Sequence, residues 1–527
     1  MGQSRRAFLA AGSAWFAGVV SMPALGQSPT ARPFDRAVLV DTARAVAARP
    51  HEAPGAQLPG SVDGLDFDAW REIRFKPDAS LLRPPASRVR LQAFHLGHLF
   101  KRPVRLNLVA GGLATPIPYA ASDFEYGPIR FDPALPPDLG YAGWRFNYPV
   151  NAPDRFDELI SFIGSSYFRL LGRDQVYGLS ARGLSIGTGL LDNNEEFPFF
   201  REFWFETPLT SGRPDDDRII FHALLDSPSV AGAYSFELRP GTVATVDVTA
   251  TLFARKTLAH VGIAPLTSMY FIGENDRHYN DRNRYDDYRP EMHDSDGLQI
   301  HKEDGSWLWR PLRNPQIQEL SYFQARNIRG FGLMQRDRTF SHYQDIELAY
   351  QSRPSYWIEP KGDWGDGRVE LVELATRDET ADNIIVAWLP VVPLQPLEPV
   401  TYAYRISSGL DFDGLNRLGR VAHTFTAPAG ALGSREHRHP GSRRFIVDFA
   451  GGLIDDALAS RQTPELVVSV KGGKLLRSFT APNPFVNGVR AFIDVKGNPV
   501  DTIYMRAALQ SGGQPVSETW VYRWKVE

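Results

Sequence analysis

Two stretches of the chain combine carboxylates, turn-forming residues and aromatic side chains. The first is RPEMHDSDG at residues 289–297, and the second is RDETADN at residues 377–383, which leads directly into an apolar run. Further aromatic and polar residues lie between them, namely SHYQD at 341–345, Tyr350, Arg353 and Trp357. Aromatic faces stack on sugar rings, and charged side chains hydrogen-bond to hydroxyl groups. These residue types therefore indicate a carbohydrate site.

Hydrolysis of a glycosidic bond requires two carboxyl groups in different roles. One is protonated and donates its proton to the leaving oxygen, while the other is ionised and activates a water molecule. Burial near other acids raises the pKa of one member of such a pair. The spacing alone does not distinguish this pair from solvated turn residues, which are the commoner use of aspartate in β-proteins.

Three glycine-containing motifs match known sites only in part. GLSIG at 183–187 fits the G-x-S-x-G pattern of serine hydrolases, but its flanks predict strand and turn where that motif needs a following helix. GTG at 187–189 lacks the third glycine of a dinucleotide loop. DFDG at 411–414 resembles half of a calcium loop without its glutamate. A strand serine and ordinary turns are the better interpretations.

Two polar segments have the residue types of metal ligands without a complete set. His437 and His439 have no third ligand nearby and are followed by Pro440, which favours a solvated loop. Residues 276–287 are dense in charges of both signs, which favours a solvent-exposed or cleft-covering loop. We therefore predict no metal and no organic cofactor.

The composition excludes several classes of function. The 58 lysine and arginine residues nearly balance the 61 aspartate and glutamate residues, so the chain lacks the basic excess of a nucleic-acid binder. There is no cysteine, which excludes disulfides, thiolate zinc sites, iron–sulfur clusters and cysteine nucleophiles. The 45 glycines, the 40 prolines and the many aromatic residues favour strands joined by turns.

Residues 1–26 are predicted to be a signal peptide of the twin-arginine type. Arg5 and Arg6 precede an apolar stretch that ends near Val20, which is shorter than the roughly 20 apolar residues of a membrane span. Small residues then allow cleavage before Gln27. A membrane anchor fits this short, glycine- and alanine-rich stretch less well. We therefore expect the mature protein in the periplasm.

The periodicity of the remaining chain predicts mostly strands. Residues 246–252 and 520–526 alternate apolar and polar side chains, as half-buried strands do. Residues 35–49 and 154–163 have apolar residues at helical spacing, so a helix is expected in each.

Residues 389–399 contain four prolines and are predicted to be a stiff linker. The prediction is thus an all-β protein with a large domain at 27–388 and a smaller β-sandwich domain at 400–527.

A series of sequence motifs lies in order along the whole mature chain. They are GSSYFR at 164–169, YGLSARGL at 177–184, EEFP at 195–198, ALLDS at 223–227, APLTSM at 264–269, HDSD at 293–296, WRPL at 309–312, FGL at 331–333 and SETW at 517–520. This pattern resembles the periplasmic glucan biosynthesis proteins G and D, the family of osmoregulated periplasmic glucan synthesis. The paired arginines of the signal peptide resemble those of subfamily D, whereas several of the other motifs are closer to subfamily G. The subfamily therefore stays open between G and D.

The resemblance implies a fold and argues further against a serine hydrolase. It implies a large N-terminal β-sandwich of the galactose-mutarotase-like kind with a long cleft, followed by an immunoglobulin-like C-terminal sandwich. The family's GLA-type phrase reads GLS here, so Ser185 looks replaceable by alanine.

The resemblance also implies an activity on β-1,2-glucan, that of anomer-inverting endoglucanases of glycoside hydrolase family 186. The matching motifs put the general acid on Asp382 and the general base on Asp294. The base is implied to act through a relay of water and a sugar hydroxyl. The other implied residues are Glu379 and Thr380, which tune the relay, and Tyr350 and Arg353, which contact the substrate.

Two other functions are compatible with the same residues. Some relatives transfer the chain to a sugar hydroxyl and close a ring, and such a transglycosylase uses the same cleft. The third hypothesis is a non-catalytic glucan-binding scaffold for the membrane glucosyltransferase that makes the chain. The expected partners are therefore β-1,2-glucan and that glucosyltransferase, and no nucleic acid.

Overall fold

The computed structural model describes residues 30–526, except residues 54, 56–57, 83–87, 191–194, 208–216, 278–286 and 431–439. The predicted signal peptide and the histidines His437 and His439 lie outside the described residues. Among the described helices, none is long and apolar enough to cross a membrane.

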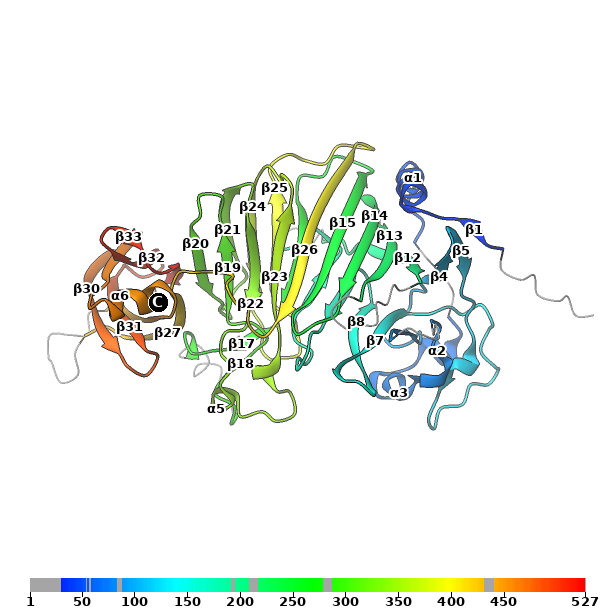
Figure 1. Ribbon diagram of the computed structural model, residues 1–527, viewed down its shortest axis with the longest axis horizontal. Coiled ribbons are helices and arrows are strands. Elements are labelled where there is room, and N and C mark those ends of the chain that lie inside the picture. The colour runs from blue at the N-terminus through cyan, green and yellow to red at the C-terminus, as the bar shows by residue number, and fades with distance from the viewer. Residues whose placement is uncertain are drawn as a thin grey trace, which may run out of the picture.

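Two extended sheets pack face to face and form the larger part of the molecule (Figure 1). The first is a 16-stranded sheet that continues into the C-terminal part of the chain. Its strands, in spatial order, are β1 (Arg32–Pro33), β5 (Leu113–Pro116), β4 (Arg105–Ala110), β12 (Phe199–Glu206), β13 (Ile219–Asp226), β14 (Val230–Arg239), β15 (Ala244–Ala254), β26 (Pro399–Gly409), β23 (Ser355–Lys361), β22 (Gly330–Met334), β19 (Gly297–His301), β20 (Trp307–Pro311), β34 (Thr519–Lys525), β32 (Thr502–Ser511) and β29 (Glu465–Lys471), with β33 (Gln514–Pro515) paired to β32.

The second sheet of the large sandwich has ten strands. They are β21 (Glu319–Arg326), β24 (Asp366–Glu373), β25 (Ile384–Pro390), β16 (Val261–Ser268), β10 (Ser180–Arg182), β9 (Tyr167–Leu170), β8 (Arg155–Ile163), β7 (Gly143–Ala152) and β3 (Arg90–Phe94), with β11 (Leu184–Ile186) paired to β16. Two short pairs lie outside the main sheets, β2 (Arg74–Phe75) with β6 (Phe124–Glu125) and β17 (Tyr270–Ile272) with β18 (Met292–His293).

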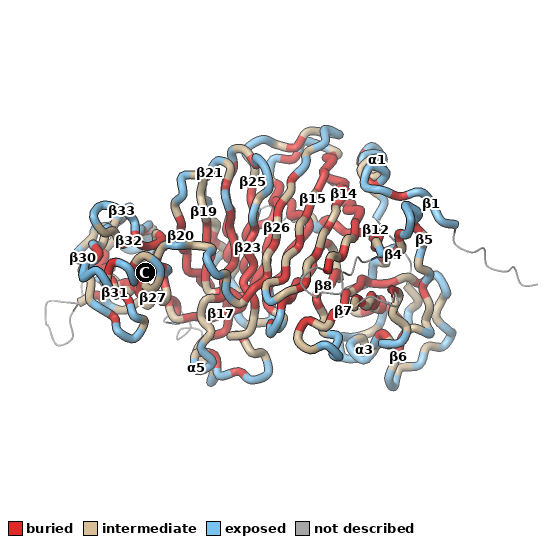
Figure 2. The backbone as a smooth tube through the Cα atoms, in the orientation of Figure 1, coloured by how far each residue is buried: buried red, intermediate tan, exposed pale blue. Residues whose placement is uncertain are grey.

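The core between the two sheets follows from the alternation of the strands. In β15, Val246 and Val248 are buried while Asp247 between them is partly exposed, which confirms the predicted strand. The core is rich in aromatic rings; Trp144 of β7 stacks on Phe162 of β8 with ring centroids 4.8 Å apart. Buried residues follow the central strands along the sandwich (Figure 2).

A smaller sandwich forms the C-terminal part. Strands β29, β32 and β34 pack against a four-stranded sheet, and a second hydrophobic core lies between them. β20 and β34 pair in parallel and so join the first sheet of the large sandwich to the smaller one. The four-stranded sheet is made of β27 (Arg420–Pro428), β28 (Ser442–Ala450), β31 (Gly488–Lys496) and β30 (Lys474–Asn483). The two sandwiches confirm the prediction of an all-β protein.

The smaller sandwich begins later in the chain than the predicted boundary at residue 400. β26 lies in the middle of the first sheet, where it pairs with β15 and β23. The proline-rich segment 389–399 connects β25 of the second sheet to β26 of the first, so it is a crossover within the large sandwich. The prolines mark the ends of strands, which proline tolerates, rather than the end of a domain.

Helices are few and short. α1 (Arg36–Ala47) matches the helix predicted at 35–49 and packs on the outer face of the first sheet. Asp35 caps it by accepting a hydrogen bond from the backbone N of Val38 at 2.8 Å. The remaining described helices are α2 (Gly60–Asp63), α3 (Phe67–Glu72), α5 (Phe340–Tyr343), α6 (Leu453–Ala459) and the 3-10 turns η1 (Pro77–Ala79), η2 (Ala121–Asp123) and η4 (Tyr350–Ser352).

The helix predicted at 154–163 is wrong, because these residues form β8. This strand pairs with β7 on one side and β9 on the other. Residues 159–162 are all buried, and a continuous buried run does not distinguish a strand from a helix by its spacing. Pairing on both edges therefore outweighs the local helical pattern.

The buried ion pair of Arg336 and Glu518 joins the two sandwiches, and its loss is expected to destabilise the protein. Glu518 accepts from Arg336 at 2.5 and 3.0 Å and from the backbone N of Val421 at 2.7 Å. Because Glu518→Ala leaves a buried guanidinium without its counterion, it is expected to lower the free energy of unfolding by about 3 kcal/mol. Urea unfolding of this variant beside Arg326→Ala, which breaks an exposed pair, checks this; equal losses would contradict it.

Candidate active site

Segments that are distant in sequence meet beside β17, β18 and α5, which lie together in the lower centre of Figure 1. The loop at 374–383 joins β24 to β25, and Asn383 at its end ties it to β17. The side-chain oxygen of Asn383 accepts from the backbone N of Tyr270 at 2.8 Å, and its amide donates to the Tyr270 carbonyl at 2.9 Å. Since β17 pairs with β18, this loop lies next to the segment that carries Asp294.

Asp294 is buried directly after β18. Its backbone N donates to the carbonyl of Met269 at 2.8 Å, and its carboxylate accepts a hydrogen bond from Arg353. Burial raises the pKa of Asp294, the positive charge of Arg353 opposes that rise, and the negative charge of Asp382 adds to it. The structure thus brings together two aspartates that are far apart in sequence.

Asp382 is exposed to solvent and lines a cavity of about 680 Å³. Removal from bulk water raises the pKa of Asp382, while the charges of Arg169, Arg182 and Arg353 lower it. Among the described residues, none donates a hydrogen bond to its carboxylate. The same cavity is lined by the aromatic residues Phe67, Trp70, Phe94, Phe100, Tyr167, Phe168 and Tyr177.

Glu379 and Tyr350 form a second contact between the segments of the site. The Tyr350 hydroxyl donates to Oε2 of Glu379 at 2.5 Å, and the guanidinium of Arg353 lies 4.0 Å from the centroid of the Tyr350 ring. Thr380 instead stays within its own loop, where its backbone N and its hydroxyl donate to Asp378 at 2.9 and 2.5 Å. The described side-chain bonds of Thr380 therefore stay within its own loop.

The sequence reasoning missed three arginines of the site. Arg169 of β9 and Arg182 of β10 act on the charge of Asp382, and Arg289 binds Glu379. Arg182 is buried, donates to Thr267 Oγ1 at 2.9 Å and lies 4.4 Å from the ring centroid of Tyr167. An arginine within the apolar phrase YGLSARGL was a usable signal, because a buried guanidinium requires anions or hydrogen-bond acceptors nearby.

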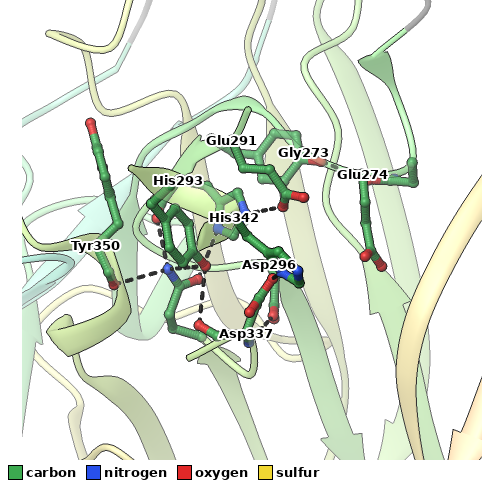
Figure 3. A network of polar contacts seen from close by, with 12 residues as sticks. Gly273, Glu274, Glu291, His293, Asp296, Asp337, His342 and Tyr350 are labelled. Carbon is green, nitrogen blue, oxygen red and sulfur yellow. Dashed lines mark hydrogen bonds and ion pairs between the residues drawn. The ribbon is translucent and has the colours of Figure 1, made fainter. Parts of the chain in front are cut away.

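A polar network lies behind the site and fixes β18 (Figure 3). His293 bonds Glu291 through Nε2 at 3.1 Å and Gln335 through Nδ1 at 2.8 Å. Burial alone lowers the pKa of His293, but the bond to Glu291 and its charge outweigh this and raise the pKa to about 9. The amide of Gln335 also donates to the carbonyls of His293 and Tyr350. This network positions the segments that precede Asp294 and Arg353.

One group in this network has the residue types of a metal site. Ligand atoms of Glu291, Asp337 and His342 lie within 4.8 Å of one another. Each is already engaged, since Glu291 binds Arg277 and His293, and His342 binds Asp337 at 2.5 Å. The arrangement is that of a hydrogen-bonded network rather than of ligands left open for an ion.

The other motifs of the sequence lie away from this site. Ser185 is buried in β11 and is followed by a turn, as predicted for a strand serine. Asp411 and Asp413 lie in an exposed turn between β26 and β27. Only the two ends of the segment 276–287 are described; Asp276 is buried, and Asp287 binds Arg289.

Together, the fold and the site describe an all-β protein with an aromatic cavity that carries a carboxylate, as a carbohydrate-handling protein requires. The chain matches the model of the family described as "Periplasmic glucan biosynthesis protein, MdoG" over residues 34–524. The protein therefore belongs to the periplasmic glucan biosynthesis protein family, and its role lies in glucan biosynthesis. This confirms the resemblance seen in the sequence.

Individual relatives cover nearly the whole chain. Glucans biosynthesis protein G of Rhodopseudomonas palustris is 42% identical over 510 residues, which are 96% of each chain. Glucans biosynthesis protein D 1 of Ralstonia nicotianae is 43% identical over 507 residues, 94% of this chain and 92% of the relative. Probable glucans biosynthesis protein D of Shewanella oneidensis is 40% identical over 500 residues, 94% of this chain and 90% of the relative. Relatives of both names are thus similar to this chain to nearly the same degree.

Proposed function

We propose that the protein is a periplasmic, anomer-inverting endo-β-1,2-glucanase with Asp382 as the general acid and Asp294 as the general base. The proposal is supported mainly by the unequal surroundings of these two aspartates. The hydrogen bond and charge of Arg353 favour the ionised form of Asp294, as a base requires. Asp382 accepts no hydrogen bond from a described residue, and its removal from water outweighs the opposing charges of nearby arginines, which favours its protonated form, as an acid requires.

In the proposed reaction, Asp382 protonates the glycosidic oxygen as the bond between two glucose residues breaks. A water molecule attacks the opposite face of the sugar, and its proton passes through a second water and a sugar hydroxyl to Asp294. The anomeric configuration is inverted, and one water is consumed for each bond cleaved. Because a relay carries the proton, the two carboxyl groups need not have the separation usual for inverting enzymes, about 6.5–9.5 Å.

The remaining site residues have supporting roles in this proposal. Glu379, held by Tyr350, and Thr380 lie on the loop of Asp382 and tune the relay. Tyr350 and Arg353 contact the sugar. The substrate chain comes from a membrane glucosyltransferase, and contact with that enzyme belongs to the same proposal.

Product analysis on linear β-1,2-glucan tests the proposed function. The purified protein is expected to release new reducing ends and shorter linear chains, each cleavage adding one water. A transglycosylase would instead give a cyclic product one water lighter, without new reducing ends. Saturable binding without any turnover would contradict an enzymatic function and favour a glucan-binding scaffold.

The pH dependence of kcat/KM is expected to respond to Arg169. The rate falls at high pH as Asp382 loses its proton and at low pH as Asp294 gains one, and raised pKa values move both limbs above the range of free aspartate. Arg169→Met removes a charge that lowers the pKa of both Asp382 and Asp294, so the alkaline limb is expected to shift upward, and the acidic limb with it. Arg169→Lys keeps the charge and serves as the control; an unshifted limb in Arg169→Met contradicts the assignment.

A further inference from the structure

Arg289 lies where carboxylates from three segments meet. Its guanidinium donates to Asp287 at 3.0 and 2.8 Å, to Asp345 at 3.0 Å, and to both oxygens of Glu379 at 2.9 and 3.0 Å. The side chain is 11% exposed. The hydrogen bonds that Arg289 donates to Asp287, Glu379 and Asp345 raise the pKa of its guanidinium, so it stays charged over the accessible pH range.

The three segments are those that carry the proposed reaction centre. Asp287 and Arg289 themselves lie on the segment that leads into β18, Asp345 lies between α5 and η4, and Glu379 lies on the loop at 374–383. Continuing along these segments, the chain reaches Asp294, then Tyr350 and Arg353, and then Asp382. A single cation therefore connects the segments that hold the acid, the base and their neighbours.

The contacts continue from Arg289 to the base without interruption. Glu379 accepts from the Tyr350 hydroxyl at 2.5 Å, the ring of Tyr350 lies under the guanidinium of Arg353, and Arg353 donates to Asp294. A displacement of Glu379 would therefore shift both aspartates, Asp294 through these contacts and Asp382 through the shared loop.

The acid-bearing loop is otherwise fixed at its two ends. Thr376 exchanges hydrogen bonds with Asn314 at one end, and Asn383 holds Tyr270 at the other. Asp378 and Thr380 bond to each other between these ends. Among the described residues of the loop tip at 377–382, Glu379 is the one whose side chain bonds to other segments, through Arg289 and Tyr350.

We propose that Arg289 is a positioning residue that holds the acid-bearing loop against the base-bearing segment without touching the reacting atoms. The proposal deepens the function proposed above and rests on it. Asp345 and Glu379 both accept from the same nitrogen, Nη1, so their charges lie close together. Without Arg289 these carboxylates repel each other, and the loop moves away together with Asp382.

Arg289→Met, which keeps the length of the side chain but removes its charge, tests the proposal on linear β-1,2-glucan. Its kcat is expected to fall by about tenfold to a hundredfold while KM changes by less than about threefold, because misplacement of the acid affects the chemical step. Arg289→Lys is expected to recover part of kcat, since an ammonium keeps the charge without the planar fork.

The matched control is Arg444→Met. It removes a bidentate ion pair with Asp494, whose hydrogen bonds are 2.6 and 2.7 Å long. Arg444 lies in the smaller sandwich, and its side chain is 17% exposed. Its melting temperature is expected to fall about as far as that of Arg289→Met, with kcat unchanged. Hydrogen exchange in peptides that cover 376–382 is expected to be faster in Arg289→Met and unchanged in Arg444→Met.

The possible outcomes separate the two proposals. If Arg289→Met keeps the kcat of the wild type while Asp382→Asn loses it, the positioning role is overturned and the proposed function stands. If the wild type itself does not turn over the glucan, the proposed function falls. Hydrogen exchange then still decides whether Arg289 holds the loop, and unchanged exchange at 376–382 overturns that role as well.

Discussion

Asp382→Asn is expected to lower kcat on linear β-1,2-glucan by about a thousandfold, which corresponds to about 4 kcal/mol of transition-state stabilisation. Asparagine has nearly the shape of aspartic acid but no proton of comparable acidity. The leaving sugar oxygen must then depart as an alkoxide, which is a poor leaving group. KM is expected to change little, because the amide still fits the same cavity and hydrogen-bonds to sugar hydroxyls.

Two comparisons sharpen the Asp382→Asn experiment. Asp366→Asn changes an exposed aspartate of β24, in the same hairpin, and is expected to leave kcat within about twofold. A β-1,2-linked oligosaccharide with an aryl leaving group needs no proton for departure, so it should recover much of the lost rate in Asp382→Asn. Turnover of unmodified glucan near the wild-type rate would contradict the assignment of Asp382 as the acid.

Asp294→Asn is expected to lower kcat by about a hundredfold or more, for a different reason. The attacking water then has no final acceptor for its proton, and Arg353 loses the anion it binds. Sodium azide is already an anion and needs no base, so it is expected to restore cleavage with a glycosyl azide as the product. Mass spectrometry detects this product, and a melting curve shows whether the variant is folded.

The comparison of the two aspartate variants assigns their roles. Azide should not restore Asp382→Asn, since that variant lacks the proton for the leaving oxygen rather than the base. An equal response of both variants to azide, or no effect of Asp294→Asn on a folded protein, would show that Asp294 is not the base.

Local sequence patterns predicted the fold correctly where a strand or a helix buries one face and exposes the other. The alternation at 246–252 and the capped helix after Asp35 are examples. The prediction was wrong at 154–163, where pairing on both edges and a continuous buried run hide the strand period. It also placed the boundary of the second domain too early, because proline content does not reveal that β26 returns to the first sheet.

The site was less accessible to sequence reasoning than the fold. The electrostatic coupling of Asp294 to Asp382 depends on the pairing of β17 with β18 and on the hydrogen bonds of Asn383 to Tyr270, neither of which has a local sequence signal. The two aspartates therefore came from the resemblance to the family and not from their spacing. Arg169 and Arg289 were missed for the same reason, since no local pattern shows which carboxylates their side chains meet in the folded chain.

The most direct test of the central claim, that Asp294 and Asp382 act together on one β-1,2 linkage with inversion, is proton NMR during the first minutes of hydrolysis of linear β-1,2-glucan. The account predicts that the new reducing ends appear first as the α-anomer, with the β-anomer growing later as the free sugar equilibrates in water. Reducing ends that appear first as the β-anomer, or a spectrum in which none form, would contradict it.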